Sequence, residues 1–433
     1  MHSPSTSAWV PLLQGASARR ARDAVEEVSR AVVTLDQTPL HRTLRGGEGA
    51  VFALLRAYEA RARHPDTPSA EAESLLEQAI GALASQPLRP TLHGGFVGIA
   101  WVAQHLHSFM GHTSQEDAHE EVEAALLDYL GQTPWRSDYD LINGLTGVAV
   151  YALERLPHPS AVACLERIVA QLESLAVRRP EGVTWWRPPR PRTCAAAKLP
   201  APFLPHGSHD LGVAHGVPGV IAALARIAAS GVATERASTL VRQSVSWLLA
   251  QRLPPGQGSC FPSNVGEEVE PAPSRAAWCY GDPGIAMTLL LAARALGVPE
   301  WEHRALEVAY EVVRRPHEET KVRDAGLCHG AAGLAHIFNR FFQATGEALF
   351  RDAAVSWYEW VLRAYRPGEG IGCFQSWELG PDGTTDWRLN PGLLSGSTGV
   401  ALALLAASTP IEPAWDRLLL TNVAPRPVES HHA

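Results

Sequence analysis

The sequence lacks any excess of positive charge. Its 433 residues include 37 lysines and arginines against 45 aspartates and glutamates, a formal net charge of −8, and neither end carries a block of like charge. Proteins that hold nucleic acid need a basic surface to displace the counterions of the phosphates. The charge balance therefore excludes nucleic acid as the main partner.

The sequence also lacks a long hydrophobic run. No apolar stretch approaches the roughly 18 residues that a membrane-spanning helix needs, and the longest, near 285–293, ends at Arg294. We therefore expect no transmembrane segment. The start of the chain, MHSPSTSAWVPLLQGASARRARDA, has no basic segment followed by an apolar stretch and a small-residue cleavage site. We therefore expect no secretion signal.

Cysteine is scarce, with six residues scattered through the chain. Small secreted domains need a dense disulfide framework, and this spacing does not provide one. We expect free or metal-bound thiols in a reducing compartment, the cytoplasm. Charged residues are also few, at 19%, while hydrophobic residues reach 46%. This composition allows a large buried core and excludes global disorder.

One glycine turn, Gly-x-x-Gly, recurs along the chain. It occurs seven times, with first glycines at Gly46, Gly95, Gly144, Gly216, Gly281, Gly330 and Gly396. The successive spacings are 49, 49, 72, 65, 49 and 66 residues, which indicates a unit of about 49 residues with insertions in some copies. Self-similarity at this period is typical of stacked or closed helical arrays.

Each turn begins an apolar helical stretch. In GVAVYALERL, Val148, Tyr151 and Ala152 show the i, i+3, i+4 spacing of a buried helix face. A second helix with charge on one face precedes each turn, as in EDAHEEVEAALLDYLGQ. The sequence therefore predicts an all-α fold, an α/α toroid or barrel of seven helix–helix repeats with GxxG turns.

Long inserts rich in proline, glycine and tryptophan precede three of the turns. They exceed the length of plain connections, so we expect them to line a binding face. Residues 373–387, CFQSWELGPDGTTDW, predict a short β-hairpin around Pro-Asp-Gly. None of the inserts has the features of a separate domain. We expect a single domain over 1–433, with an N-terminal helical segment at 1–40 and a C-terminal tail at 410–433.

Equivalent positions in a repeat array present their side chains to one shared place. The slot two residues before the first glycine holds Leu44, His93, Ile142, Ala214, Cys279, Cys328 and Leu394. Together with His329, the two cysteines suit Zn²⁺, and three protein ligands leave a fourth position for water or substrate. Two alternatives stay open. The cysteines could pack as small buried hydrophobes, and His336 could be either a fourth ligand or a satisfied polar group on its helix.

The turns resemble those of the lanthionine synthetase C-like (LanC) cyclases across essentially the whole chain. The resemblance is most specific at three short motifs, Trp278-Cys279-Tyr280-Gly281, Cys328-His329-Gly330 and Ala214-His215-Gly216. It implies a seven-fold α/α toroid. It also implies a zinc ion held by Cys279, Cys328 and His329.

The resemblance further implies three catalytic residues. His215 matches an acid–base histidine, Asp140 an aspartate near the zinc, and Arg275 an active-site arginine. Each has a structural alternative, because His215 could bond to the turn backbone, Asp140 could cap the turn, and Arg275 could be solvated in a loop. A further family histidine could correspond to His206, to His209 or to neither.

The family chemistry joins a peptide cysteine thiol to dehydroalanine or dehydrobutyrine, which a separate dehydratase makes from Ser or Thr. A thiol with a pKa of about 8.5 is mostly protonated at pH 7, and coordination to zinc ionises it. We therefore expect a zinc-dependent lanthionine or methyllanthionine cyclase acting on a dehydrated precursor peptide. Alternatives are addition of glutathione or another small thiol to dehydroamino acids, a non-catalytic peptide-binding scaffold, or a glycosidase using carboxylates such as Glu48 and Asp282.

Overall fold

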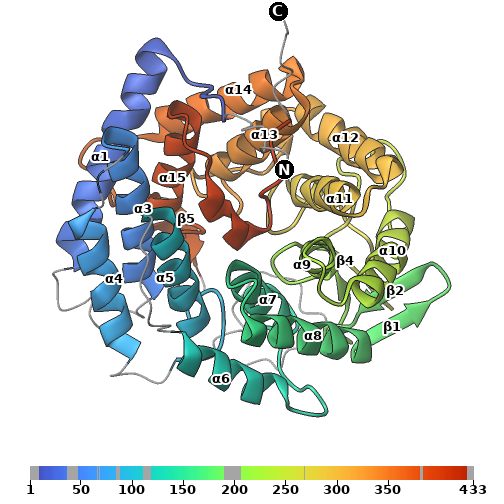
Figure 1. Cartoon of the computed structure of the whole chain (residues 1–433). Coiled ribbons are helices and arrows are strands. Elements are labelled where there is room, and N and C mark those ends of the chain that lie inside the picture. Colours follow the sequence, from blue (N-terminus) through green and yellow to red (C-terminus); the bar gives the residue numbers. More distant parts are fainter. Residues whose placement is uncertain are drawn as a thin grey trace, which may run out of the picture.

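The helices form two concentric rings around a common axis (Figure 1). The computed structural model describes residues 9–36, 47–65, 67, 69–83, 88–110, 119–189, 206–267, 269–380 and 384–426. The inner ring consists of α3 (Gly47–Arg63), α5 (Phe96–Met110), α7 (Leu145–Glu154), α9 (Val217–Ala229), α11 (Asp282–Leu296), α13 (Ala331–Thr345) and α15 (Ser397–Ser408). The outer ring consists of α1 (Gly15–Asp36), α4 (Ala70–Leu83), α6 (Glu120–Leu130), α8 (Pro159–Ser174), α10 (Thr234–Ala250), α12 (Pro299–Arg314) and α14 (Ala348–Ala364).

The inner ring is closed. Each inner helix contacts the next one along the chain, and the last, α15, contacts the first, α3. Every inner helix begins at the residue after the first glycine of a Gly-x-x-Gly turn. The expected toroid of seven helix–helix repeats is therefore confirmed. Its first turn glycine, Gly46, lies outside the described residues.

The two rings differ in how their helices are buried. Inner helices pack against two neighbours and an outer helix, so α15 is buried along its whole length, and the predicted core residues of α7 are buried as well. Outer helices are amphipathic. In α12, Ala305 and Val308 face the core while Arg304 and Glu300 form an exposed ion pair of 3.0 Å. Among the described helices, none combines the length and apolarity needed to cross a membrane.

At the described turns, Gly-x-x-Gly folds the preceding loop tightly beneath the inner helix. At Gly281, φ is +145°, and a Cβ atom would lie 2.0 Å from the carbonyl oxygen of Arg275. At Gly284, a Cβ atom would lie 2.2 Å from the carbonyl oxygen of Trp278. Glycine is required at both positions because any side chain would collide with the backbone six residues earlier. The turn therefore fixes where the residues just before it are held.

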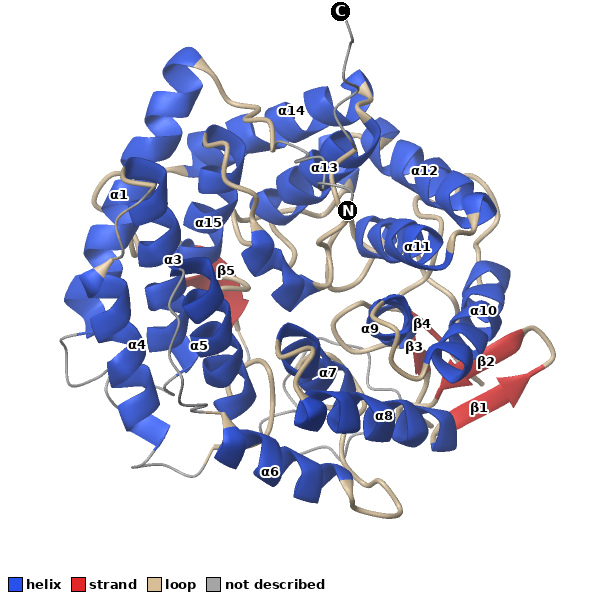
Figure 2. Cartoon of the chain, in the orientation of Figure 1, coloured by secondary structure: helices blue, strands red, loops and turns tan. Residues whose placement is uncertain are grey.

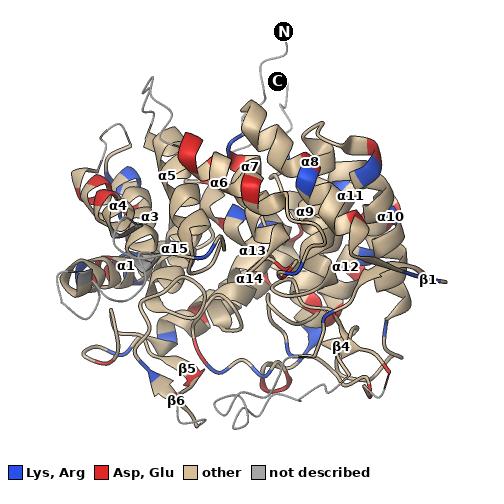
Figure 3. Ribbon diagram, turned by 90° about the horizontal axis from the view of Figure 1, so that it is seen from below, with Lys and Arg blue, Asp and Glu red and all other residues tan. Residues whose placement is uncertain are grey.

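Three short antiparallel strand pairs decorate the ring (Figure 2). They are β1 (Ala176–Arg179) with β2 (Gly182–Trp185), β3 (His209–Asp210) with β4 (Asn264–Val265), and β5 (Ser376–Leu379) with β6 (Thr385–Arg388). Strands β5 and β6 confirm the predicted hairpin, with Trp377 opposite Trp387, although its tip at 381–383 lies outside the described residues. In the view turned by 90° from that of Figure 1, β4, β5 and β6 lie below the helices, at the same end of the ring (Figure 3).

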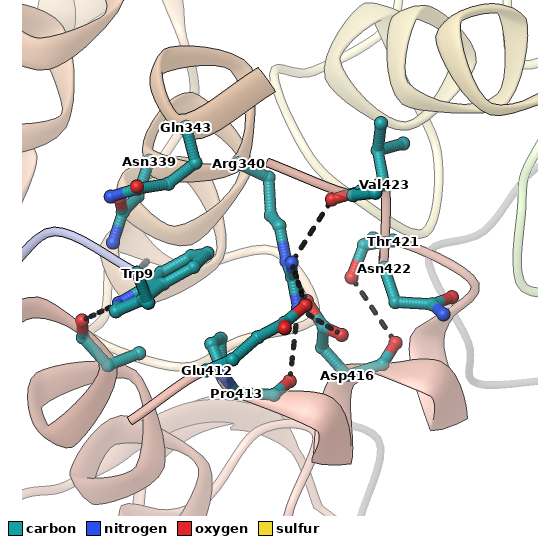
Figure 4. Close-up of polar contacts among 12 residues, drawn as sticks. Trp9, Asn339, Arg340, Gln343, Glu412, Pro413, Asp416, Thr421, Asn422 and Val423 are labelled. Carbon is teal, nitrogen blue, oxygen red and sulfur yellow. Dashed lines mark hydrogen bonds and ion pairs between the residues drawn. The ribbon is translucent and has the colours of Figure 1, made fainter. Parts of the chain in front are cut away.

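A buried ion pair fastens the C-terminal segment to the ring (Figure 4). Arg340 of α13 is fully buried and donates from Nε to Asp416 Oδ2 at 2.6 Å and from Nη2 to Asp416 Oδ1 at 3.0 Å. Asp416 belongs to η3 (Ala414–Leu419). The guanidinium also donates to the carbonyl of Val423 (3.1 Å) and lies over the ring of Trp9, 4.8 Å from its centroid. One charged side chain thus joins the beginning and the end of the described chain.

Candidate active site

Backbone hydrogen bonds link the loops that precede the inner helices. Five backbone N–H groups donate to a carbonyl of a neighbouring loop. The pairs are His93 to Ile142 (3.4 Å), Leu141 to Ala214 (3.2 Å), Ala214 to Cys279 (3.5 Å), Cys279 to Cys328 (3.2 Å) and Cys328 to Leu394 (2.6 Å). All of these residues except Leu141 occupy the slot two residues before the first glycine. Successive repeats therefore meet at the position that the sequence singled out.

Cys279 and Cys328 are neighbours in this series of bonds, and they form a cluster with His329. The two sulfur atoms and a ring nitrogen of His329 all lie within 4.8 Å of one another. Cys279 is buried, and the other two are partly buried. Within the described residues, this is the only group of three His, Cys, Asp or Glu side chains that meets so closely. Packing behind the turns does not explain why three donor atoms converge.

Hydrogen bonds within the cluster separate the pKa values of its two thiols. The pKa of Cys279 lies well below the ordinary thiol value because Cys328 hydrogen-bonds to its sulfur, with further lowering from His329. The same bond raises the pKa of Cys328, and burial raises it further. The pKa of His329 is raised because it hydrogen-bonds to Cys279. The cluster thus favours a thiolate at Cys279, the form of cysteine that binds metals.

The cluster fits a tetrahedral zinc ion. Typical bonds of about 2.3 Å to sulfur and about 2.0–2.1 Å to nitrogen place ligand atoms about 3.5–3.8 Å from one another. The observed limit of 4.8 Å is close enough that small side-chain rotations would close the site. Two thiolates and one imidazole are soft-to-borderline donors, which suit zinc better than magnesium or calcium. Cys279, Cys328 and His329 would be its ligands.

Two charged residues border the cluster. Arg275 is exposed, and its positive charge lowers the pKa of both cluster cysteines. Its side chain makes no ion pair within the described part of the chain. Asp324 is buried and holds its loop by accepting the backbone N–H groups of Gly326 (3.1 Å) and Trp377 (2.9 Å). Its charge also raises the pKa of His329. No motif in the sequence had pointed to Asp324.

His215 and Asp140 form a pair on the adjoining loops. Nδ1 of His215 lies 2.6 Å from Oδ2 of Asp140, while Oδ1 of Asp140 accepts the backbone N–H of Asn143 at 2.7 Å. Burial alone would raise the pKa of Asp140, but the hydrogen bond and charge of His215 hold it below the ordinary value. Asp140 therefore supports the turn with one oxygen and orients His215 with the other. Nε2 of His215 has no hydrogen-bond partner among the described residues.

A second polar group near His215 was missed at the sequence level. Tyr280 donates its hydroxyl proton to Asp210 (2.7 Å), and Arg187 Nη1 also donates to Asp210 (2.8 Å). The ring of Tyr280 lies 6.3 Å from that of His215, centroid to centroid. Arg187 and Asp210 come from the tryptophan-rich insert, whose length indicated function but whose sequence did not show which residues return to the ring.

His93 also lies near the pair. Burial lowers the pKa of His93 to about 4, so this imidazole is neutral at pH 7, and charges on His215 and Asp140 act on it more weakly. Its Nε2 atom is buried with no hydrogen-bond partner in the described part of the chain. The repeat slot that contains both cysteines also contains His93, and that shared position was the one signal available in the sequence.

The remaining candidate histidines lie outside the cluster. His209 is buried in β3, with Nδ1 at 3.1 Å from both the hydroxyl of Thr184 and the carbonyl of Trp185. His206 is exposed. His336 lies in α13 and pairs with Asp416 at 2.8 Å, so the fourth-ligand alternative is wrong. It is a satisfied polar group on its helix at Nε2, although its Nδ1 has no partner among the described residues.

Other cysteines and acids have structural positions. Cys164 is in the core of α8, where burial raises its pKa to about 11. Cys260 and Cys373 are buried and free, and Cys194 lies outside the described residues. Asp282, considered for a glycosidase, is fully buried and pairs with Arg315 at 2.5 Å. The side chain of Glu48 lies outside the described part of the chain.

Comparisons with known proteins agree with this architecture. The family model of the lanthionine synthetase C-like protein matches residues 41–420. The structure resembles that of nisin cyclase with a TM-score of 0.67 and 19% sequence identity, covering 92% of this chain and 96% of that one. At this identity the likeness shows a shared fold.

Two curated relatives match a shorter region. A Danio rerio protein named glutathione S-transferase LANCL1 is 27% identical over 160 residues, 36% of each chain. An Arabidopsis thaliana protein named LanC-like protein GCL1 is 25% identical over 158 residues, 36% of this chain and 34% of that one. The matched regions thus span about a third of these relatives.

Proposed function

Because the chain belongs to the lanthionine synthetase C-like family, we propose that it is a zinc-dependent cyclase that forms thioether rings in a peptide. Its substrate would be a dehydrated precursor peptide that carries cysteine together with dehydroalanine or dehydrobutyrine. The products would be lanthionine and methyllanthionine, respectively. The residues of the cluster and of the His215–Asp140 pair support this proposal by their chemistry.

The observation that carries the proposal is the convergence of Cys279, Cys328 and His329 within 4.8 Å. Three ligands leave one position of a tetrahedral ion open, as in catalytic zinc sites. Zinc bound there would supply the acidity that turns an incoming substrate thiol into a thiolate at neutral pH. The protein would contribute two anionic sulfurs and the neutral imidazole of His329.

His215 is the proposed proton donor. When the substrate sulfur bonds to the β-carbon of the alkene, the π electrons move toward the carbonyl oxygen and form an enolate. The α-carbon then needs a proton, which Nε2 of His215 would deliver while Asp140 holds Nδ1. The proton of the substrate thiol is released in exchange, so the mass of the peptide does not change.

Arg275 is the proposed partner of the developing negative charge. Its exposed guanidinium acts on both cluster cysteines and has no carboxylate partner within the described residues. Arg187 is a weaker candidate because Asp210 already neutralises it at 2.8 Å. A free positive charge near the reacting atoms favours an enolate over the neutral alkene.

Partners and compartment follow from the same chemistry. The substrate must arrive with its Ser or Thr already dehydrated, so we assign that step to a separate dehydratase. Ligand cysteines must remain reduced, and the five described cysteines that lie outside disulfides suit a reducing compartment such as the cytoplasm. We treat residues 1–433 as one functional domain, with the segments 1–40 and 410–433 as its ends.

Addition of glutathione is the second candidate. The observation that favours it is the Danio rerio relative, whose name is that of a glutathione S-transferase. The same cluster could hold the thiol of glutathione and direct it to a dehydroamino acid. The two activities differ in mass, because ring closure leaves the peptide mass unchanged whereas glutathione addition increases it.

Metal content tests the centre of the proposal. We expect the purified protein to hold about one zinc per chain by elemental analysis, and Cys279→Ala to reduce this at least tenfold. Cys164→Ala is the matched control, because it removes a thiol that lies in the helix core away from the cluster. A wild-type protein without bound metal after expression in zinc-supplied cells would refute the zinc centre.

Ring closure tests the activity. With a dehydrated cysteine peptide, we expect alkylable thiol to disappear without a mass change, and a chelator or Cys328→Ala to stop the reaction. A mass gain in the presence of glutathione, with no ring closure, would replace the first function by the second. Peptide binding without any thiol loss would instead support the scaffold alternative.

A further inference from the structure

A groove beside the metal cluster remains without a role. Its volume is about 530 Å³, and it runs between the end of α14, the loop before α13 and the β5–β6 hairpin. Three arginines and two tryptophans are among the residues that border it: Arg323, Arg363, Arg366, Trp360 and Trp387. We call it the arginine groove.

The positive charge of the arginine groove is not neutralised. All three arginines are exposed, and none forms an ion pair within the described part of the chain. Two acids also border the groove. Asp324 is buried and already accepts two backbone N–H groups, which leaves Glu369 as the one exposed acid on the lining. Three guanidiniums against one exposed carboxylate favour a ligand with several negative charges.

Aromatic contacts hold one of these arginines in place. Arg323 lies over the ring of Trp377, 5.4 Å from its centroid, and Trp377 meets Trp387 edge-on at 5.4 Å. Trp387 is 48% exposed, so the groove offers a large apolar face beside its charges. Such a surface suits a chain whose carboxylates alternate with apolar groups.

The groove borders the loop that carries Cys328. Asp324 and Ala325 line the groove, and Cys328 follows three residues later. The bond from Trp377 N–H to Asp324 (2.9 Å) fixes the β5–β6 hairpin to this loop. A peptide whose cysteine reaches the cluster would therefore run its flanking residues along the hairpin and the end of α14.

We infer that the arginine groove binds an acidic stretch of the peptide substrate, near the cysteine that reacts. This inference rests on the proposed function for the identity of the substrate. Binding itself needs neither the metal nor the reaction. Carboxylates pair with Arg363 and Arg366 on one wall and with Arg323 on the other, while apolar side chains pack on Trp360 and Trp387.

Fluorescence anisotropy with two labelled peptides tests the groove. Both peptides carry a cysteine and no dehydroamino acid, so no reaction occurs. One peptide has three consecutive aspartates at the positions where the other has three asparagines. We expect the aspartate peptide to bind about tenfold more tightly at low salt, since exposed charge pairs contribute modestly and are screened by salt. Arg363→Gln combined with Arg366→Gln should reduce this preference to about twofold.

A matched control uses the same helix. Arg351 lies at the start of α14, pairs with Asp352 and does not border the groove, so Arg351→Gln should leave the preference unchanged. Equal affinities for the two peptides, or a full preference in the triple variant that also carries Arg323→Gln, would overturn the inference.

The outcome is distinguishable from failure of the cyclase. A Cys279→Ala protein should keep the preference for the aspartate peptide. If the wild type closes no ring yet prefers that peptide, the groove stands and the proposed function falls. If the wild type closes rings with the same kcat/KM for the aspartate and asparagine versions of a dehydrated peptide, the proposed function stands and the groove inference falls.

Discussion

Chemically identical cysteines differ here because of their neighbours. Cys164 lies among apolar side chains, and burial raises its pKa to about 11. Cys279 is also buried, but hydrogen bonding from Cys328 and His329 brings its pKa well below the ordinary value. One thiol is therefore inert, while the other is prepared for a metal. Residue type alone does not make this distinction.

Asp140 is the residue whose proposed role is most open to test. Asp140→Asn keeps the size of the side chain but removes the charge that holds Nδ1 of His215. We expect kcat for ring closure to fall about 10- to 100-fold, less than the about 10²- to 10⁴-fold loss for His215→Ala. Zinc content should stay the same in both variants. An unchanged kcat in Asp140→Asn would limit Asp140 to supporting its turn.

The same substitution has a pH signature in stability. The pKa of Asp140 is lower in the folded state than its ordinary value, so ionised Asp140 favours folding above about pH 4. This contribution is lost as the pH falls through the lower, folded pKa. In urea unfolding, the stability difference between wild type and Asp140→Asn should therefore be nearly constant from about pH 7 to 5 and shrink below about pH 4. A difference that grows on acidification would contradict the sign.

At the scale of elements, the turn does more than connect two helices. At the six described Gly-x-x-Gly turns, from α5 to α15, the preceding loop passes so close beneath the inner helix that no Cβ atom fits at either glycine. This close approach fixes the backbone of Cys279 and of Cys328 relative to the helix that follows each one. The repeated loop is therefore the scaffold of the cluster.

Gly284→Ala tests this link between turn and site. The added methyl group would lie 2.2 Å from the carbonyl oxygen of Trp278, so the loop carrying Cys279 must open. We expect unfolding to become about 1–3 kcal/mol easier and zinc affinity to fall about tenfold, measured by urea unfolding and competition with a chelator.

Gly81→Ala is the matched control for that change. A Cβ atom at Gly81 of α4 meets nothing within 4 Å. This substitution should stabilise the protein by about 0.5–1 kcal/mol, because alanine favours the helix. Loss of stability in both variants would show that glycine at the turn has no special role.

At the scale of the whole molecule, the ring is completed by charge as well as by packing. Helix α15 contacts α3, and Arg340 then fastens η3 and residues up to Val423 against the inner face of α13. The pair it forms with Asp416 is fully buried. Breaking such a pair strands a charge in the core.

Asp416→Asn should therefore destabilise the protein strongly. It removes the buried counterion of Arg340 and leaves the half-exposed carboxylate of Glu412, at 3.1 Å, as its remaining ion pair among the described residues. It also weakens the bond to His336, and we expect a cost of about 3–5 kcal/mol in urea unfolding. The double variant Arg340→Met with Asp416→Leu should recover much of that loss because no charge stays buried. Arg314→Gln, which breaks an exposed pair with Glu311, should change stability by less than about 0.5 kcal/mol. Equal effects from Asp416→Asn and Arg314→Gln would show that burial of the pair is unimportant.

Sequence by itself determined the repeat, because Gly-x-x-Gly and the 3.6-residue apolar period act locally and need no partner to be recognised. It also singled out Cys279, Cys328 and His329, since equivalent slots of a closed array must converge. Tertiary structure alone decided that Asp324, Arg187 and Asp210 reach the same end of the ring, and that His336 turns toward Asp416. These contacts join segments that are far apart in the chain. The path of a long insert or of a C-terminal segment depends on the surface that it can bury, and no local sequence pattern encodes that surface.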